Sequence, residues 1–366
     1  MAQTLQTSDI DLLIGGYGSL QGSHGRGIEL CTAHITDDGV ASLHHQRLLS
    51  DVPSPSWLER YRVGGTVDMV YAVLENNRGL AALRIDDDHD SCRLTLVSHV
   101  AVIGDGPTHV AVATDDQGNA HAITANYVSG SISVFPINTD GSLGDVSQTL
   151  PGDPDEGHGP LPAQEGPHAH WILPLPDGRV LSTDLGADRI YVHRWMNGEL
   201  VRTGMVRLAP GTGPRDMHLL PVASESNHFD EWRVAVVNEW GRTVTVLDAN
   251  DLRILQTIDL DAEPADQAAS LAFIPSANGY EGMAYVGLRG SDRIVALSWD
   301  GRTLTRRESV SSGEGRPRHL CAIGRYLIAA NETQDHLTMF HSDETGHLTV
   351  AHDLPIGSPT VILPLQ

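Results

Sequence analysis

Short runs of alternating apolar and polar residues follow one another along the whole chain. After GPRDMHLLPV at residue 213 come RVAVVNEWG, TVTVLDAND and ILQTIDLD. Alternation of this kind, with many valine, isoleucine and threonine residues, favours β-strands. The Asp-Gly and Asn-Gly pairs between other runs favour tight hairpins. No stretch predicts a helix of about ten residues or more, so the pattern predicts an all-β protein of many short strands.

The run that opens each group of strands recurs along the chain. The copies are SPSWLER at 54, GPTHVAV at 106, GPHAHWI at 166, GPRDMHL at 213, DQAASLAFIP at 266, RPRHLCA at 316 and GSPTVIL at 357, which lie 41 to 60 residues apart. Four-stranded units at such a spacing are typical of β-propeller blades. Seven copies predict a seven-bladed β-propeller of four-stranded antiparallel blades, in one domain over residues 1–366. First strands are expected to start near residues 56, 108, 168, 215, 269, 318 and 360.

The two ends of the chain predict how the ring closes. The last segment, PTVILPLQ, has the pattern of a first strand with no blade after it. The first segments, DLLIGGYG, GIELCTAHI and ASLHHQRLLS, have the patterns of second, third and fourth strands. We therefore expect the C-terminal strand to complete the N-terminal blade, which leaves no free sheet edge in the ring.

Polar residues recur where the first strands begin. The copy at 266 lacks the proline that the other six copies share. The position after that proline holds Ser56, Thr108, His168, Arg215, Arg318 and Thr360, and His109 and His319 follow directly. The predicted second strands end at Asn126, Asp184, Asn238, Leu288 and Asn331, next to Tyr127, Glu239, Arg289 and Glu332, with Glu75 in a similar place. First strands line the channel of a propeller, and the second strands run back to the same end. One mouth of the channel should therefore collect Arg215, Arg318, His168, His319, Asp184 and Glu239.

Charge and cysteine content narrow the partners and the compartment. A net charge of −23 repels nucleic acid and anionic membrane surfaces, so neither is expected as a partner. Cys31, Cys92 and Cys321 lie far apart, which suggests free thiols in a reducing compartment. The N-terminus lacks a basic start with an apolar run, and no stretch approaches the roughly 18 apolar residues of a membrane helix. We expect a cytoplasmic protein.

Histidines 168 and 170 admit more than one chemical role. They share a face of a strand because they are two residues apart, and Asp184 or His218 could complete a metal site. Two nearby arginines would repel a cation, so no metal and no other cofactor is predicted. A histidine titrates near neutral pH and suits general-base catalysis, which favours His168 as a base. His170 could instead serve only to hydrogen-bond a neighbouring blade.

Arginines 215 and 318 also allow two interpretations. They could pair with Glu239 or Glu332 and hold blades together. Both, however, follow a proline at the same repeat position, which favours a shared anionic ligand bound by guanidinium groups. Glu239 is either an ion-pair partner or a carboxylate that orients water. The chain contains no nucleophile elbow, P-loop, dinucleotide-binding fingerprint or zinc-protease motif.

Four segments together resemble the seven-bladed lactonase family, which includes propeller-type 6-phosphogluconolactonases and is related to 3-carboxy-cis,cis-muconate lactonizing enzyme. They are GPHAHWILPLPDGRVLSTDLGADRIYVHRW, GPRDMHLLP, VVNEWGRTVTVLD and RPRHLCAIGRYLIAANETQDHLTMF. The resemblance runs over nearly the whole chain and implies a site formed by His168, Arg215, Glu239 and Arg318. Family members typically have Pro-Arg-His where this chain has Pro-Arg-Asp at residues 214–216, and the charge of Asp216 would weaken phosphate binding by Arg215.

The resemblance implies a lactonase of carbohydrate metabolism that hydrolyses an anionic sugar lactone, with 6-phosphogluconolactone of the pentose phosphate pathway as the expected substrate. The expected catalytic residues are His168, Glu239 and Arg215, and the expected substrate-binding residues are Arg318, His319, Asp184, His170, Asn126 and His109. A muconate-type lactonizing cycloisomerase and a non-catalytic ligand-binding propeller are the alternatives. The expected partner is a small anion, and the protein is expected to be a monomer or a homodimer.

Overall fold

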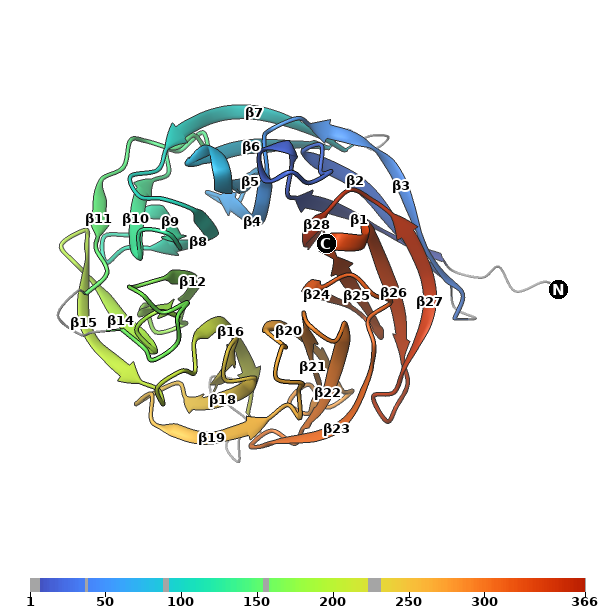
Figure 1. Ribbon diagram of the computed structural model, residues 1–366. Helices are drawn as coiled ribbons and strands as arrows, with labels where there is room; N and C mark the ends of the chain where they lie inside the picture. Colours follow the sequence, from blue (N-terminus) through green and yellow to red (C-terminus); the bar gives the residue numbers. More distant parts are fainter. Residues whose placement is uncertain (1–6, 37–38, 88–91, 154–157, 223–231, 366) are drawn as a thin grey trace.

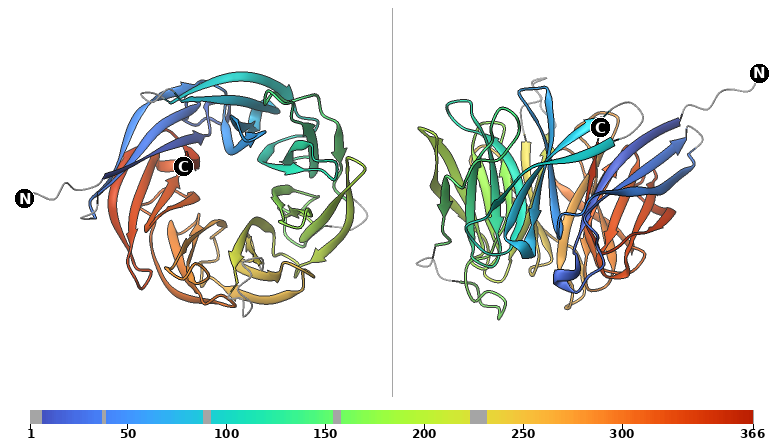
Figure 2. Two further views of the ribbon diagram at one scale, coloured as in Figure 1. Left: turned by 180° about the vertical axis from the view of Figure 1, so that it is seen from behind. Right: turned by 90° about the horizontal axis from the view of Figure 1, so that it is seen from above.

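The computed structural model describes residues 7–36, 39–87, 92–153, 158–222 and 232–365. In these residues seven four-stranded antiparallel sheets stand around a central channel, like blades (Figure 1). The views from behind and from above show the same ring (Figure 2). The seven-bladed propeller predicted from the repeat is confirmed.

The blades are numbered from the one that contains the N-terminal strands. Blade 1 contains β28 (Pro359–Pro364), β1 (Thr7–Gly16), β2 (Ile28–Thr36) and β3 (Ala41–Ser50). Blade 2 contains β4 (Pro55–Val63), β5 (Val67–Leu74), β6 (Gly79–Asp87) and β7 (Cys92–Ala101). Blade 3 contains β8 (Pro107–Thr114), β9 (Ala120–Asn126), β10 (Ser131–Pro136) and β11 (Gln148–Leu150). Blade 4 contains β12 (Ala169–Pro174), β13 (Val180–Asp184), β14 (Arg189–Met196) and β15 (Glu199–Arg207).

The remaining blades have the same order from the channel outward. Blade 5 contains β16 (Pro214–Pro221), β17 (Trp232–Asn238), β18 (Thr243–Asp248) and β19 (Ile254–Asp259). Blade 6 contains β20 (Ala268–Pro275), β21 (Gly282–Leu288), β22 (Arg293–Trp299) and β23 (Leu304–Ser311). Blade 7 contains β24 (Pro317–Ile323), β25 (Tyr326–Asn331), β26 (His336–Ser342) and β27 (Leu348–Pro355). In the described part of the chain, the 3₁₀ turns η1 (Ser19–Gln21), η2 (Glu75–Asn77) and η4 (Glu332–Gln334) follow the second strands β1, β5 and β25.

The C-terminal strand closes the ring as the sequence predicts. β28 pairs with β1 in antiparallel register, with Leu13 opposite Leu363 and Ile14 opposite Ile362. At Gly15, β1 comes so close to blade 2 that an added Cβ atom would lie 2.2 Å from the carbonyl oxygen of Pro55. Closure therefore depends on both ends of the chain and on a glycine at their junction.

Apolar residues from adjacent blades form shared cores. One cluster combines Val237 and Val246 of blade 5 with Val286 and Trp299 of blade 6. Another combines Ile362 of blade 1 with residues of blade 7 that include Ile328. Each blade thus buries its faces against its two neighbours, which explains why strands with alternating patterns need the whole ring.

Hydrogen bonds that first-strand side chains accept from backbone N–H groups of the next blade also connect the blades. Nδ1 of His109 accepts from the Ile172 N–H at 3.3 Å, and Nδ1 of His319 accepts from the Ile362 N–H at 3.1 Å. Oγ of Ser270 accepts from the Leu320 N–H at 3.2 Å, and Oδ2 of Asp216 accepts from the Leu271 N–H at 3.3 Å. These bonds give the polar first-strand residues a structural reason to be there, since buried N–H groups need acceptors.

Candidate functional site

A β-bulge near the start of every innermost strand turns one side chain toward the channel. The register shift lies at Ser56, Thr108, Arg215, Arg318 and Thr360 in five blades, and at the pairs His170–Trp171 and Ala269–Ser270 in blades 4 and 6. Bulges of this kind re-aim side chains and are frequent next to active sites. The polar ring inferred from the repeat is therefore a ring of bulged residues.

The register corrects one alignment made from the sequence. The repeat aligned His168 with Arg215. In the structure, Ala169 pairs with the last residue of its second strand, Asp184, just as Pro214 pairs with Asn238. The residue equivalent to Arg215 is therefore the one after Ala169, which is His170. Pro167, the proline of this repeat, lies two residues before Ala169. It packs against Gly130 of blade 3, where an added Cβ atom would lie 2.4 Å from the Pro167 carbonyl oxygen. The proline therefore does not mark the same position in every blade.

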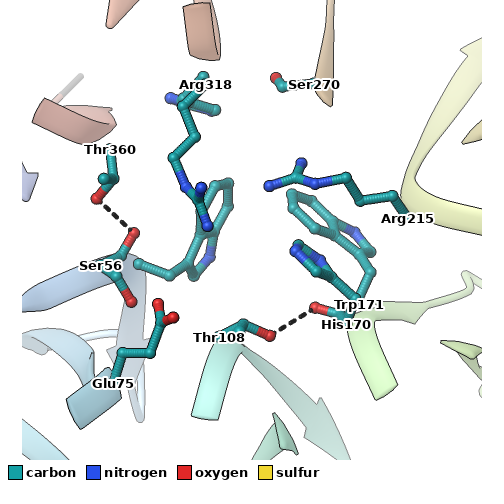
Figure 3. Close-up of a pocket in the computed structure, with 11 residues that line it drawn as sticks. Ser56, Glu75, Thr108, His170, Trp171, Arg215, Ser270, Arg318 and Thr360 are labelled. Atoms are coloured by element: carbon teal, nitrogen blue, oxygen red, sulfur yellow. Dashed lines mark hydrogen bonds between the residues drawn. The ribbon is translucent and has the colours of Figure 1, made fainter. Parts of the chain in front are cut away.

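The bulged residues surround a cavity at the centre of the ring (Figure 3). The cavity is open to solvent, and about 330 Å³ of empty space, part of it open solvent, lies between its walls. Its lining residues are Ser56, Trp57, Glu75, Thr108, His170, Trp171, Arg215, Ser270, Arg318, His319 and Thr360. Of the predicted site residues, Arg215, Arg318, His170 and His319 thus meet at one cavity. Figure 3 shows both guanidinium groups directed into it.

Four aromatic rings from different blades contact one another across the channel. The Trp57 ring lies 4.7 Å from that of Trp171, 4.7 Å from that of His109 and 5.0 Å from that of His319, centroid to centroid. His109 and Trp171 are 3.8 Å apart. We call these four residues the aromatic floor. Three of them, Trp57, Trp171 and His319, also line the cavity, so part of its wall is aromatic.

Arg215 and Arg289 both contact the carboxylate of Glu239. Oε2 of Glu239 lies 3.2 Å from Nε of Arg215 and 2.7 Å from Nη2 of Arg289. Nη1 of Arg215 also donates to the Ala269 carbonyl oxygen at 2.7 Å. Burial and the nearby Arg289 and Arg318 lower the pKa of Arg215 to about 10, so it stays charged at neutral pH. Two cations share one carboxylate here, which leaves a local excess of positive charge.

Arg318 lies against Tyr17 and faces Glu332. Its Nη1 donates to Oε2 of Glu332 at 3.4 Å, and its guanidinium carbon lies 4.7 Å from the centre of the Tyr17 ring. Both arginines therefore have the carboxylate partners that a structural role requires. They also line the cavity, so ion pairing and ligand binding are compatible in this geometry.

The histidines of the cavity are held neutral by their surroundings. Burial, together with Arg215 and Arg318, lowers the pKa of His170. Burial lowers the pKa of His319 to about 3 and also lowers that of His109. The fixed positive charge of the cavity therefore comes from arginine alone, in a chain whose net charge is −23.

Five of the nine predicted site residues are not among the residues that line the cavity: Glu239 and His109, described above, and His168, Asp184 and Asn126. His168 stacks on Tyr127 with ring centres 4.5 Å apart, and its Nδ1 lies 2.9 Å from the Tyr127 carbonyl oxygen. Asp184 accepts hydrogen bonds from the backbone N–H groups of His168 and Ala187. Asn126 donates to Ser131 and Ser133 within its own blade. Functional roles for these residues, and for His168 as a base, stay predictions.

Trp57, Trp171 and Ser270 line the cavity but are absent from the sequence-based set. A signal was present for the tryptophans, because each follows a bulged residue, as Ser56-Trp57 and His170-Trp171. Ser270 belongs to the repeat copy that lacks the proline. Aromatic residues next to a polar ring position therefore mark the floor of this site.

Within the described parts of the chain, no group of three or more histidine, cysteine, aspartate or glutamate residues is arranged to hold a metal ion. No helix among the described residues is long and apolar enough to cross a membrane. All three cysteines are buried and free.

The buried imidazole of His319 predicts that the protein loses stability in mild acid. Its pKa of about 3 in the folded protein compares with about 6.5 in an unfolded chain. Below pH 6.5 or so the unfolded chain therefore binds a proton that the native protein does not, and stability falls by up to about 1.4 kcal/mol per pH unit until the pKa of the folded state is reached.

Urea unfolding at pH 7 and pH 5 measures this loss. His319→Asn keeps an acceptor for the Ile362 N–H and removes the titration, so its loss between the two pH values should be smaller than that of the wild type. Equal losses in the two proteins would exclude His319 as the cause.

Comparison with known proteins adds family information to this geometry. A family model described as "Lactonase, 7-bladed beta-propeller" matches residues 11–364. Among curated proteins, the chain is 30% identical over 327 residues to the 6-phosphogluconolactonase of Bacillus subtilis (strain 168), which covers 86% of this chain and 88% of that protein.

Solved structures show the same architecture. The periplasmic gluconolactonase PpgL of Pseudomonas aeruginosa superposes with a TM-score of 0.80 and 25% identity, over 98% of this chain and 99% of that one. A protein from Lactobacillus plantarum superposes with a TM-score of 0.78 and 21% identity, over 98% and 100%. Since one of these relatives is periplasmic, the cytoplasmic location stays a prediction.

Proposed function

Because the chain belongs to the seven-bladed β-propeller lactonase family, we propose that it hydrolyses the lactone of an anionic sugar acid, with 6-phosphogluconolactone as the substrate. The observation that carries this proposal is the cavity where Arg215 and Arg318 meet above the aromatic floor. A 6-phosphogluconolactonase among the relatives supports the choice of substrate.

The two arginines suit different parts of such a substrate. Lactone hydrolysis develops negative charge on the carbonyl oxygen, and a fixed guanidinium stabilises it. A second guanidinium can hold a remote phosphate and use that binding energy to orient the ring. We assign the carbonyl oxygen to Arg215 and the phosphate to Arg318. The apolar faces of Trp57 and Trp171 can support the sugar ring, as aromatic side chains do in many ligand pockets.

The aspartate after Arg215 is compatible with this proposal. Oδ2 of Asp216 accepts the Leu271 N–H, the same kind of contact that His319 makes with Ile362. Its Oδ1 lies 2.7 Å from Nε2 of His218. Asp216 therefore serves as a blade-joining acceptor at the position where family members typically have a histidine.

Kinetics on a panel of lactones test the proposal. We expect kcat/KM for 6-phosphogluconolactone to exceed that for the neutral gluconolactone by about 10-fold or more, because a hydrogen-bonded charge is worth about 1.5–3 kcal/mol. Arg318→Ala should reduce this preference. Arg325→Ala, an exposed arginine of the same blade, removes the same charge and should preserve it.

The panel also distinguishes the other functions. Equal kcat/KM for the charged and the neutral lactone would overturn the phosphosugar assignment. Turnover of a carboxymuconolactone alone would favour a cycloisomerase. Ligand binding without turnover of any lactone would favour a binding protein.

A further inference from the structure

Three glutamates occupy the same place in three blades, and one of them differs in its surroundings. Glu239 and Glu332 directly follow β17 and β25, as Glu75 follows β5. In blades 5 and 7 the bulged residue is an arginine that contacts the glutamate of its own blade, at 3.2 Å for Arg215 and 3.4 Å for Arg318. In blade 2 the bulged residue is Ser56. Among the described residues, no arginine of blade 2 therefore lies within ion-pair distance of Glu75.

The two carboxyl oxygens of Glu75 differ in how firmly they are held. Oε1 accepts a hydrogen bond from the Tyr17 hydroxyl at 3.1 Å. Oε2 is buried and makes no hydrogen bond of ordinary geometry among the described residues, although the Ser56 hydroxyl lies beside the carboxyl group and interacts with it. Glu75 lines the cavity, and Figure 3 shows its carboxyl group turned inward beside Ser56. A buried carboxyl oxygen left unpaired is costly unless a ligand or water satisfies it.

Burial leaves Glu75 more basic than an exposed glutamate. Burial raises the pKa of Glu75, Arg318 and the hydroxyl groups of Ser56 and Tyr17 lower it, and Glu332 raises it, so the net direction is upward. Glu239, in contrast, contacts two guanidinium groups through Oε2. That oxygen of Glu239 is therefore occupied, whereas a carboxylate with a raised pKa, such as that of Glu75, is a better base near neutral pH.

We propose that Glu75 is the general base that activates the attacking water, an inference that rests on the lactonase function proposed above. Oε2 takes a proton from water as the water oxygen bonds to the lactone carbonyl carbon, and the carbonyl electron pair moves to the oxygen beside Arg215. When the tetrahedral intermediate collapses, the ring C–O bond breaks and Glu75 returns the proton to the leaving ring oxygen. Lactone and water thus give the hydroxy acid, with no further reactant.

The test is Glu75→Gln, which keeps the shape of the side chain and an acceptor for Tyr17 but cannot take the proton. We expect kcat to fall by about 10²–10⁴-fold, the usual contribution of a general base, while KM changes by less than about 3-fold. In the wild type, kcat/KM should rise with pH through the Glu75 pKa, and this limb should vanish in the variant. Glu199→Gln, an exposed glutamate of blade 4, is the matched control and should behave as the wild type.

The outcomes separate this inference from the function beneath it. If Glu75→Gln unfolds at the wild-type temperature and keeps its kcat, or loses only affinity, Glu75 is not the base although the lactonase function stands. If the wild type turns over no lactone, both proposals fail. If Glu75→Gln does not fold, Glu75→Asp decides: a shortened base should lower kcat and retain the pH-dependent limb, and an unchanged kcat overturns the inference.

Discussion

Replacing Arg215 with alanine is expected to lower kcat/KM for the anionic lactone by about 10²–10³-fold, the usual cost of losing one group that stabilises an oxyanion. Arg215 projects from a bulge in β16 and lines the cavity. Its position is fixed by the Ala269 carbonyl oxygen and by Glu239. A prepositioned charge in a buried site needs no reorganisation when negative charge develops, so its loss should appear mainly in kcat.

Steady-state kinetics of Arg215→Ala measure this loss, with Arg194→Ala as the control for the change in net charge. Arg194 is exposed on β14, so that variant changes the net charge equally without touching the cavity. Its kcat/KM should stay at the wild-type value. Arg215→Lys should restore little, because an ammonium group cannot reproduce the planar fork of a guanidinium. An Arg215→Ala enzyme with wild-type kcat/KM would remove Arg215 from the mechanism.

Shortening Ile362 to alanine should destabilise the protein by about 2–5 kcal/mol, as is usual for buried isoleucine. Ile362 lies opposite Ile14 in the pairing that closes the ring. It also packs into the core that blade 1 shares with blade 7. The cavity left by the missing atoms would therefore weaken a sheet and an interface between blades at once.

Urea unfolding measures this effect against Ile254→Ala, since Ile254 is 48% exposed on the edge strand β19. The control should change the free energy of unfolding by less than about 0.5 kcal/mol. If both variants lose the same small amount, the closing strand does not carry the stability that its burial implies.

The repeat in the sequence was sufficient to predict the ring. Alternating strands, turn residues and copies at regular spacing are local features, and each is visible in one stretch of chain. The incomplete units at the two ends then predicted the pairing of β28 with β1, which the register confirms. The same spacing brought Arg215, Arg318 and His319 to one mouth, where they line one cavity.

Positions within a blade were harder to predict. A proline marked the start of most first strands, but Pro167 lies two residues before the equivalent place, so His168 was aligned where His170 stands. The offset lies between Pro167 and Ala169, before the alternating residues of β12 (Ala169–Pro174), so the pattern of apolar positions does not reveal it.

The amino-acid pattern was enough to predict the seven blades, their closure and the arginines that face the channel, because periodicity and repeat spacing record which residues share a face. Which glutamate contacts arginine, and which does not, follows from the three-dimensional arrangement of the blades. Glu75, Glu239 and Glu332 look alike in the chain, yet Glu239 contacts two guanidinium groups and Glu75 none at ion-pair distance among the described residues. Such differences depend on distances between blades, and so do the burial and the charge balance that set the pKa of each carboxyl group.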